Sequence, residues 1–211
     1  MKHKKTKKIL ELFCGTGSVG KVAKEQGWNV LSLDYEEKFN PHFCMDIMDF
    51  NYEQFKPGEF DIIWASPCCR LFSILQNTWI GRKWKNKEEI IEARKKDSKY
   101  VLRVLEIINY LKPNEWFIEN PNSSAMWDIP QLKDLNYVIC DYCCFGYDYR
   151  KSTRFLTNKI LENKTCKCES KNGEKKHKSR IGNFGTQDTT LAERYRIPPD
   201  CIKYLFGIKT L

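Results

Sequence analysis

Short apolar runs alternate along the chain with segments whose apolar residues recur at helical spacing. The apolar runs, which predict buried strands, lie at residues 8–13, 29–34, 60–65, 115–119, 135–142 and 153–157. Helical spacing predicts one helix over residues 18–26 and a longer one over residues 87–111. Because strands and helices alternate, we expect a parallel, doubly wound α/β sheet with helices on both faces.

Two polar stretches interrupt this pattern. Residues 70–86 form an expected loop that places three aromatic residues among basic side chains. Residues 159–180 are rich in lysine and carry two cysteines and a histidine. Since the sequence contains neither an internal repeat nor a second set of core segments, we expect residues 1–211 to form a single domain.

The composition excludes several classes of protein. The chain has 211 residues, of which 41% are hydrophobic, so it is long enough and apolar enough to fold around a core. No apolar run approaches the ~18–20 residues that cross a bilayer. The basic N-terminal stretch leads directly into the first predicted strand, which is not the pattern of a signal peptide. We therefore expect a protein that is neither secreted nor bound to a membrane.

The charge and the cysteine content limit the kinds of partner and the roles of the thiols that we expect. Lysine and arginine number 36 against 27 acidic residues, and the formal net charge is +9. This excess fits either a polyanionic partner such as nucleic acid or a lysine-rich solvated surface. In a chain without a secretory signal, the ten cysteines favour free thiols, a metal site or a catalytic thiol over disulfides.

Glycines and a carboxylate stand where predicted strands end, at the edge at which open α/β sheets bind ligands. The first strand ends in Glu11-Leu-Phe-Cys-Gly-Thr-Gly17, whose glycines let a backbone approach a ligand closely. Asp34 ends the second strand, where an acid can accept hydrogen bonds from the two hydroxyls of a ribose. These residues predict a site for a nucleoside cofactor. Gly20 completes a G-x-G-x-x-G pattern, so a dinucleotide enzyme is an open alternative at this point.

A thiol pair and a carboxyl group end the next two strands. Ser66-Pro-Cys-Cys69 follows the strand at residues 60–65, and a cysteine after a strand-ending proline is a candidate nucleophile. Glu119-Asn-Pro121 ends the following strand, so its carboxyl group is expected to face the same cleft. Each motif alone has an ordinary structural explanation, as a buried thiol or as an ion-pair partner. Together they place a nucleophile, an acid and a cofactor turn on neighbouring strands.

Short motifs in this order resemble those of the cytosine-5 DNA methyltransferase family. The glycine turn resembles the family's (D/E)LFxGxG cofactor turn, and Ser66-Pro-Cys-Cys-Arg-Leu-Phe-Ser73 resembles its PPCQxFS catalytic loop. Glu119-Asn-Pro121 resembles the ENV element, in the ENP form of small phage- and virus-like members. A basic stretch within residues 145–154 and the proline-containing segment at residues 196–205 complete the resemblance.

The resemblance implies a fold, a reaction and a set of site residues. The implied fold is the Rossmann-like sheet of class I S-adenosylmethionine-dependent methyltransferases, and the reaction methylates cytosine carbon-5 in DNA through a covalent cysteine adduct. The residues implied in cofactor binding are Phe13, Cys14, Gly15, Thr16, Gly17, Asp34, Asp46 and Pro67. Those implied in catalysis are Cys69, Glu119, Asn120, Lys151 and Arg154.

Two adjacent cysteines compete for the role of nucleophile. Counting back from Phe72-Ser73, the family's C-x-x-F-S spacing selects Cys69. Counting forward from Pro67 alone would select Cys68. We prefer Cys69, because that alignment preserves two anchors rather than one.

The basic element departs from the family pattern. In Tyr149-Arg-Lys-Ser-Thr-Arg154, Lys151 and Thr153 occupy the places of the two arginines of R-x-R. Arg150 or Arg154 could replace the missing arginine, and we expect Lys151 and Arg154 to orient the substrate. The region that follows is much shorter than a usual target-recognition domain, so the small basic insertion at residues 159–183 is a candidate for a reduced one.

Soft metal ligands occur in the same insertion. Cys166-Lys-Cys168 and His177, with Cys143 or Cys144, could supply four ligands to zinc. C-x-C is tighter than the usual C-x-x-C knuckle. A loop with incidental thiols is therefore the favoured interpretation, and we assign no metal.

Three other functions share some of these features. We expect DNA to be the partner of this protein. RNA is the alternative, because a tRNA-methylating branch of the family has the same motifs. An amino-methylating enzyme is disfavoured, because its (D/N/S)PP(Y/F) motif needs an aromatic residue where Cys68 and Cys69 stand. The altered arginine element also fits a non-catalytic protein that binds cofactor and nucleic acid. We expect a monomer in the cytoplasm, or in the host cytoplasm or nucleus if the chain is viral.

Overall fold

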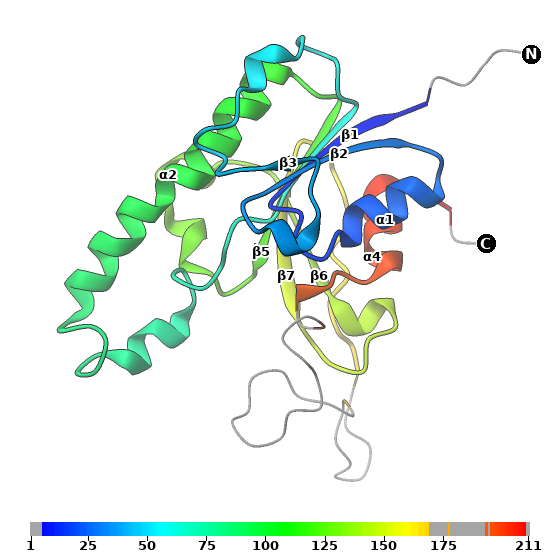
Figure 1. Ribbon diagram of the computed structural model, residues 1–211. Helices are drawn as coiled ribbons and strands as arrows, with labels where there is room; N and C mark the ends of the chain where they lie inside the picture. The colour runs from blue at the N-terminus through cyan, green and yellow to red at the C-terminus, as the bar shows by residue number, and fades with distance from the viewer. Residues whose placement is uncertain (1–5, 169–176, 178–192, 194, 210–211) are drawn as a thin grey trace, which may run out of the picture.

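The described residues of the computed structural model, 6–168, 177, 193 and 195–209, form one seven-stranded sheet in the order β3-β2-β1-β4-β5-β7-β6 (Figure 1). The strands are β1 Lys8–Leu12, β2 Asn29–Asp34, β3 Phe43–Cys44, β4 Ile62–Ala65, β5 Glu115–Pro121, β6 Tyr137–Asp141 and β7 Ser152–Thr157. All six predicted strands are confirmed to within two residues at each end, and β3 is an addition to them. Residues 169–176 and 178–183, most of the basic insertion, lie outside the described residues, as do residues 1–5.

The sheet is mixed rather than wholly parallel. Strands β1 to β5 run parallel to one another, whereas β7 is antiparallel to both β5 and β6. The expectation of a parallel sheet is therefore wrong for β7. A parallel crossover needs about a dozen residues or more, and the connection from β6 to β7 spans only residues 142–151. Such a short connection returns the chain in the opposite direction.

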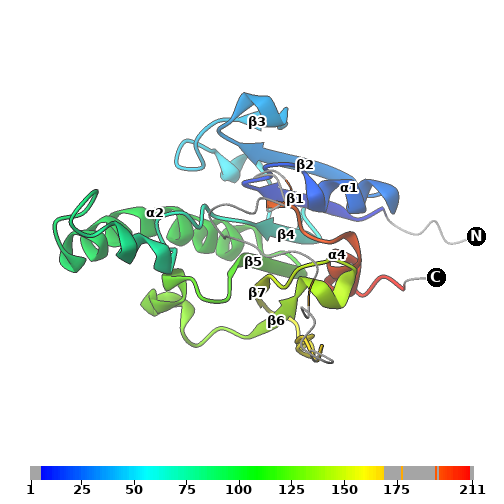
Figure 2. The same cartoon turned by 90° about the horizontal axis from the view of Figure 1, so that it is seen from below.

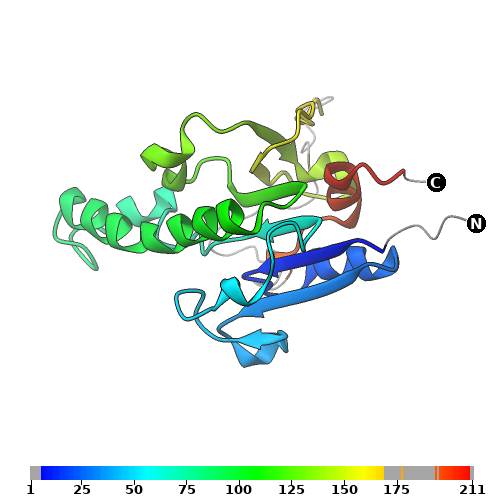
Figure 3. The same cartoon turned by 90° about the horizontal axis from the view of Figure 1, so that it is seen from above.

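Helices cover both faces of the sheet, as predicted (Figure 2, Figure 3). Helix α2, Lys87–Leu111, covers one face, while α1, Ser18–Glu25, and α4, Pro199–Phe206, lie against each other on the other face. Short 3₁₀ segments occupy the connections: η1 Glu37–Phe39, η2 Tyr52–Gln54, η3 Ile74–Trp79, η4 Ala125–Asp128, η5 Pro130–Leu132 and η6 Tyr142–Phe145. None of the helices in the described part of the chain combines the length and the apolar content that a membrane span needs.

Side-chain alternation along the strands decides which face each candidate site residue occupies. In β5, Ile118 belongs to the core beneath α2, and Phe117 belongs to the core beneath α1 and α4. By the same alternation, Glu119 lies on the α1–α4 side of the sheet and Asn120 on the α2 side. Two adjacent residues of one motif therefore lie on opposite faces of the sheet.

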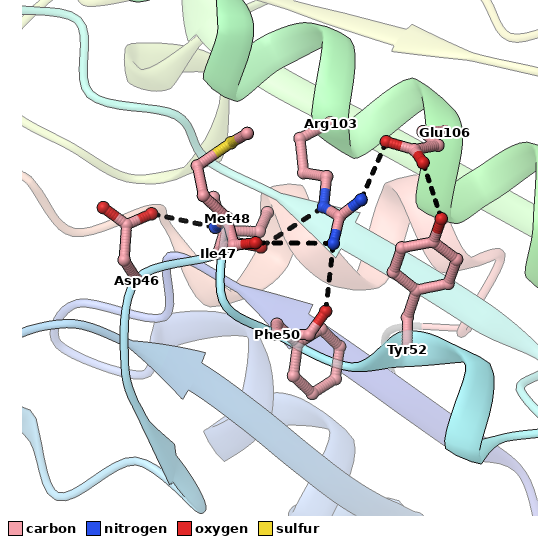
Figure 4. A network of polar contacts seen from close by, with 7 residues as sticks. All are labelled: Asp46, Ile47, Met48, Phe50, Tyr52, Arg103 and Glu106. Atoms are coloured by element: carbon pink, nitrogen blue, oxygen red, sulfur yellow. Dashed lines mark hydrogen bonds and ion pairs between the residues drawn. The ribbon is translucent and has the colours of Figure 1, made fainter.

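Helix α2 fastens the loop after β3 through Arg103 (Figure 4). The Arg103 guanidinium donates to the carbonyl oxygen of Phe50 at 3.2 Å and pairs with Glu106 at 2.9 Å. Glu106 in turn accepts a hydrogen bond from the Tyr52 hydroxyl at 2.6 Å. The loop that contains Asp46 is therefore held against α2.

Candidate active site

The turn between β1 and α1 leaves room for a ligand beside its backbone. Phe13, Gly15 and Gly17 have φ angles of 56°, 49° and 68°, in the left-handed region that favours glycine. A Cβ built on Gly15 or Gly17 would meet nothing within 4 Å among the described residues. The two glycines therefore line an open cradle in which the main chain can approach a ligand closely.

The other residues of the turn fasten it in place. Cys14 is buried, and its N–H donates to the carbonyl oxygen of Leu33 at 3.1 Å. Burial raises the pKa of the Cys14 thiol to about 12, so this thiol stays protonated. The hydroxyls of Thr16 and Ser18 form a hydrogen bond of 3.2 Å. The sequence-predicted cofactor turn thus has a fixed backbone with an open side.

Two carboxylates stand at the same edge of the sheet, because β2 and β3 are neighbours. Asp34 Oδ2 accepts a hydrogen bond from the N–H of Gly15 at 2.8 Å, and Oδ1 accepts one from the N–H of Glu36 at 3.0 Å. Asp46 Oδ1 accepts a hydrogen bond from the N–H of Met48 at 2.9 Å. A carboxylate offers about four acceptor positions, so each acid has acceptor capacity for ligand groups beyond these bonds.

Tyr35 is a candidate site residue that the sequence analysis overlooked. It directly follows Asp34, and 61% of its surface is exposed. Its hydroxyl donates to Glu36 Oε1 at 3.0 Å. An exposed ring beside an acid that suits a ribose is available to stack on a base. The sequence feature that could have identified Tyr35 is its place as an aromatic residue immediately after the acid that ends β2.

Glu11, also overlooked, explains the third glycine of the pattern. Its carboxylate is buried and accepts hydrogen bonds from the N–H groups of Gly20, at 2.9 Å, and Val19 at the start of α1. A Cβ on Gly20 would lie 2.6 Å from Glu11 Oε2, which no side chain could tolerate without a shift. Gly20 therefore allows α1 to pack closely against β1, and this packing, rather than a ligand, explains the glycine at this position.

The burial of Glu11 makes stability depend on pH. Burial raises the pKa of Glu11 from 4.5 to about 7. Because the folded-state pKa is the higher one, the contribution of Glu11 to stability is fully present below pH 4.5 and is lost as the pH rises through about 7. A shift of this size corresponds to about 3 kcal/mol. We expect Glu11→Gln to become more stable relative to the wild type by up to this amount between pH 4.5 and about 8.

Urea unfolding at several pH values measures this difference. The variant Glu25→Gln, at the exposed end of α1, is the matched control and should follow the wild type throughout. A difference between Glu11→Gln and the wild type that does not change with pH would contradict the prediction.

Cys69 lies on the loop after β4, beside a carboxylate and an ammonium group. Cys69 is half-buried, whereas Cys68 is exposed. The Sγ of Cys68 accepts a hydrogen bond from Arg70 Nε at 3.5 Å. Burial and the negative charge of Glu119 raise the pKa of the Cys69 thiol to about 11, and the positive charge of Lys151 opposes this rise. The structure therefore brings together three of the sequence-predicted catalytic residues.

Glu119 is a buried carboxyl group with a hydroxyl partner. Burial raises its pKa, while the charge of Lys151 and a hydrogen bond with Ser66 lower it. The Ser66 hydroxyl also accepts a hydrogen bond from Trp64 Nε1 at 2.9 Å, which fixes its position. Sequence reasoning treated Ser66 only as the start of the loop, and the structure gives it a contact with the acid.

Asn120 acts on the opposite face of β5. It is fully buried, and its Nδ2 donates to the carbonyl oxygen of Pro67 at 2.9 Å. Its Oδ1 has no hydrogen-bond partner within the described residues. The bond to Pro67 ties β5 to the first turn of the loop that carries Cys69, so Asn120 positions that loop.

The two basic candidates lie on different sides of the sheet. Lys151 lies near Glu119, and its ammonium group stands 5.0 Å above the centre of the Tyr142 ring. Arg154 is paired with Asn120 across β5 and β7, and so shares the α2 side. Its guanidinium lies over the Tyr137 ring at 4.6 Å. The structure brings Lys151 to the catalytic pair but not Arg154.

Helix α2 also fastens the far end of the catalytic loop. Arg94 donates from Nε to the carbonyl oxygen of Leu71 at 3.0 Å and from Nη2 to that of Ser73 at 3.0 Å. Phe72, between these two residues, is buried. Beyond this anchor the chain is exposed, and Trp79 stands there with several basic side chains.

The soft metal ligands singled out in the sequence lie apart from this site, after the end of β6. Cys166, Cys168 and His177 gather around Cys143, and Cys144 is not part of the group. None of them belongs to the cofactor turn or to the catalytic loop.

Comparison with known proteins gives one extensive relative. No family model matches the chain. A protein of Frog virus 3 (isolate Goorha), named "Probable DNA (cytosine-5)-methyltransferase", is 33% identical over 217 residues. The match covers 95% of this chain and 99% of the relative, so the two proteins correspond over nearly their whole lengths.

Two solved structures share the fold at low sequence identity. The Entamoeba histolytica methyltransferase EhMeth is 16% identical with a TM-score of 0.54, and the match covers 77% of this chain and 58% of EhMeth. A prophage-encoded E. coli protein, assigned as a DNA modification methyltransferase, is 15% identical with a TM-score of 0.52, covering 72% of this chain and 46% of that protein. The chain thus spans about half the length of these structures. Their likeness confirms the predicted Rossmann-like fold.

Proposed function

The chain belongs to the cytosine-5 DNA methyltransferase family, and we infer that it is an enzyme that methylates carbon-5 of cytosine in DNA, with Cys69 as the nucleophile. The observation that carries this function is the grouping of Cys69, Glu119 and Lys151. The group stands at the ends of β4, β5 and β7, and β4 is the neighbour of β1, which carries the open glycine turn. A nucleophile, an acid and a cofactor cradle therefore share one edge of the sheet.

The glycine turn and the two acids fit S-adenosylmethionine. The open cradle at Gly15 and Gly17 admits a ligand against the main chain. Asp34 would accept hydrogen bonds from the ribose hydroxyls, Asp46 would accept one from the adenine amino group, and the exposed Tyr35 ring would stack on the adenine. When bound, S-adenosylmethionine supplies an electrophilic methyl group on a sulfonium.

Removing the Asp34 carboxylate should weaken cofactor binding. We expect Asp34→Ala to bind S-adenosylhomocysteine about 10–100-fold more weakly, because hydrogen bonds to a charged group contribute about 1.5–3 kcal/mol. Calorimetric titration measures the affinity. Asp49→Ala, an exposed acid close to Asp46, is the matched control and should bind as the wild type does. Equal affinities of Asp34→Ala and Asp49→Ala would contradict this assignment of the ribose acid.

Cys69 makes carbon-5 of cytosine reactive. Its thiolate adds to carbon-6, and the Sγ–C6 bond turns carbon-5 into an enamine-like nucleophile that can take a methyl group. Loss of the carbon-5 proton then expels the thiolate. Since the pKa of the resting thiol is about 11, the thiol is protonated at neutral pH. Lys151 favours the thiolate by its charge, and an ionised Glu119 opposes it.

Glu119 supports the addition from ring nitrogen-3. Negative charge develops on that nitrogen as the thiolate adds, and a protonated Glu119 carboxyl stabilises it by donating a hydrogen bond. The raised pKa of Glu119 makes its protonated form more accessible near neutral pH than in an ordinary glutamate. A neutral Glu119 also stops raising the pKa of Cys69. One protonation event therefore assists both the acid and the nucleophile.

The substrate base must leave the helix, because the ring faces are covered in a stacked duplex. The exposed stretch of residues 74–86, with Trp79 and several basic side chains, follows the catalytic loop and would face the DNA. The formal charge of +9 supports contacts with phosphates. The basic insertion at residues 159–183 would add to these contacts as a reduced recognition module.

Methyl transfer from S-adenosylmethionine to duplex DNA, compared with transfer to tRNA, tests this function. We expect 5-methylcytosine in the digested DNA, detected by mass spectrometry of the nucleosides. Methylation of tRNA alone would make the protein an RNA enzyme. Cofactor binding without methylation of either substrate would make it a non-catalytic binding protein. Either result contradicts DNA methylation.

A further inference from the structure

Four soft ligands meet after the end of β6. The thiol sulfurs of Cys143, Cys166 and Cys168 and a ring nitrogen of His177 all lie within 4.8 Å of one another. Cys166 Sγ and His177 Nε2 are 3.5 Å apart. In a tetrahedral zinc site with bonds of about 2.3 Å to sulfur and about 2.0–2.1 Å to nitrogen, a sulfur and a nitrogen ligand lie about 3.6 Å apart. The separation of Cys166 and His177 is therefore that of two ligands of one zinc ion.

The sheet edge holds two of these ligands in place. Cys143 lies in η6, directly after β6. The segment before Cys166 runs beside β6, where the N–H of Lys164 donates to the carbonyl oxygen of Ile139 and the N–H of Asp141 donates to that of Lys164, both at 2.8 Å. Segments more than 20 residues apart in sequence thus bring their thiols together on one scaffold.

A buried acid also fixes the backbone at Cys166. Asp141 is fully buried, and its Oδ2 accepts a hydrogen bond from the N–H of Cys166 at 2.8 Å. The same oxygen pairs with Arg150 Nε at 2.9 Å, so its charge is compensated. Such outer contacts orient the ligands of a metal site.

The ligand set selects the metal. Three thiols and one imidazole form the Cys₃His set of structural zinc sites, and soft thiolates disfavour magnesium, calcium and manganese. Four protein ligands complete a tetrahedron and leave no open position for a substrate or water. The ten cysteines, all described, form no disulfide. The cluster is thus suited to a structural ion rather than to catalysis.

We propose that Cys143, Cys166, Cys168 and His177 bind one Zn²⁺ that holds residues 166–168 and His177 at the β6 edge of the sheet. Binding forms three Zn–S bonds and one Zn–N bond, and the three thiols release their protons to solvent. None of the four ligands belongs to the cofactor turn or the catalytic loop, so the metal takes no part in the bond changes of methyl transfer. The sequence favours incidental thiols because C-x-C is tighter than C-x-x-C, and the proposal rests instead on the grouping of the four side chains in space.

Metal analysis of the full chain tests the proposal. The protein is purified from cells supplied with zinc, passed over a chelating resin, and analysed by plasma mass spectrometry. We expect about one zinc per chain. Cys143→Ser, Cys166→Ser and Cys168→Ser should lose the metal. Cys144→Ser, an exposed thiol next to Cys143, is the matched control and should keep it.

A titration of the wild type with Co²⁺ covers the case in which the serine variants do not fold. After removal of zinc by a chelator, Co²⁺ should give the intense visible absorption of a tetrahedral thiolate site, saturate at about one ion per chain, and be displaced by Zn²⁺. The proposal is overturned if the wild type holds no zinc and gives no such spectrum. It is also overturned if Cys143→Ser retains as much zinc as Cys144→Ser.

Discussion

Replacing Cys69 with alanine is expected to abolish methyl transfer, with a loss of at least on the order of 10⁴-fold in rate, as removal of a nucleophile costs other covalent enzymes. Cys68→Ala is expected to retain activity within about tenfold. The reason is the environment of each thiol. Burial raises the pKa of the Cys69 thiol, the charge of Glu119 raises it further, and the charge of Lys151 lowers it. Cys68 is exposed and hydrogen-bonds Arg70 instead.

Initial rates of methyl transfer to duplex DNA measure both variants. Binding of S-adenosylhomocysteine is the control for folding, because the cofactor turn is independent of either thiol, and both variants should bind it as the wild type does. If Cys68→Ala loses activity and Cys69→Ala keeps it, the alignment from Pro67 alone is the right one and the assignment of the nucleophile is wrong.

Glu119→Gln is expected to change two rates in opposite directions. Methyl transfer should fall by about 10²–10³-fold, because the proton donor at ring nitrogen-3 is lost. Alkylation of Cys69 by iodoacetamide should become roughly tenfold faster, because the negative charge that raises the pKa of this thiol is gone. A merely misfolded variant would expose all its thiols rather than accelerate one of them.

The alkylation rate is read for Cys69 alone by mass spectrometry of its peptide. A Cys68→Ser background removes the neighbouring thiol from that peptide. Lys151→Gln provides the opposite test, because loss of its positive charge should slow alkylation of Cys69. A rate for Cys69 that is unchanged or slower in Glu119→Gln would contradict the electrostatic coupling of the two residues.

The sequence predicts elements well where local signals agree. Helix α2 has the predicted bounds, because the Asn86 side chain caps it through the N–H of Glu89 at 3.0 Å and Pro113 follows its end. The direction of β7 was missed, because a strand's own pattern of apolar residues does not encode the direction of its neighbours. That direction follows from the length of the β6–β7 connection, which the sequence does contain.

Some residues of the candidate site could likewise be predicted from local motifs, and others could not. Motif order predicted Cys69 and Glu119, which the structure brings together. Lys151 and Arg154 were both expected to orient the substrate because they lie in the element that resembles R-x-R, whereas the register of β7 places Arg154 opposite Asn120 on the α2 side. The contact between Glu11 and Gly20 depends on how β1 packs against α1, which no local pattern reveals.

We infer that Cys69 forms a covalent bond with cytosine in DNA. Incubation with duplex DNA that contains 5-fluorocytosine, in the presence of S-adenosylmethionine, tests it on a denaturing gel. Fluorine at carbon-5 blocks the final elimination, so a working thiolate stays attached to the base. We predict a shifted band for the wild type and for Cys68→Ala, and none for Cys69→Ala. Absence of an adduct on oligonucleotides that cover many sequence contexts, from a protein that binds the cofactor, would contradict the claim.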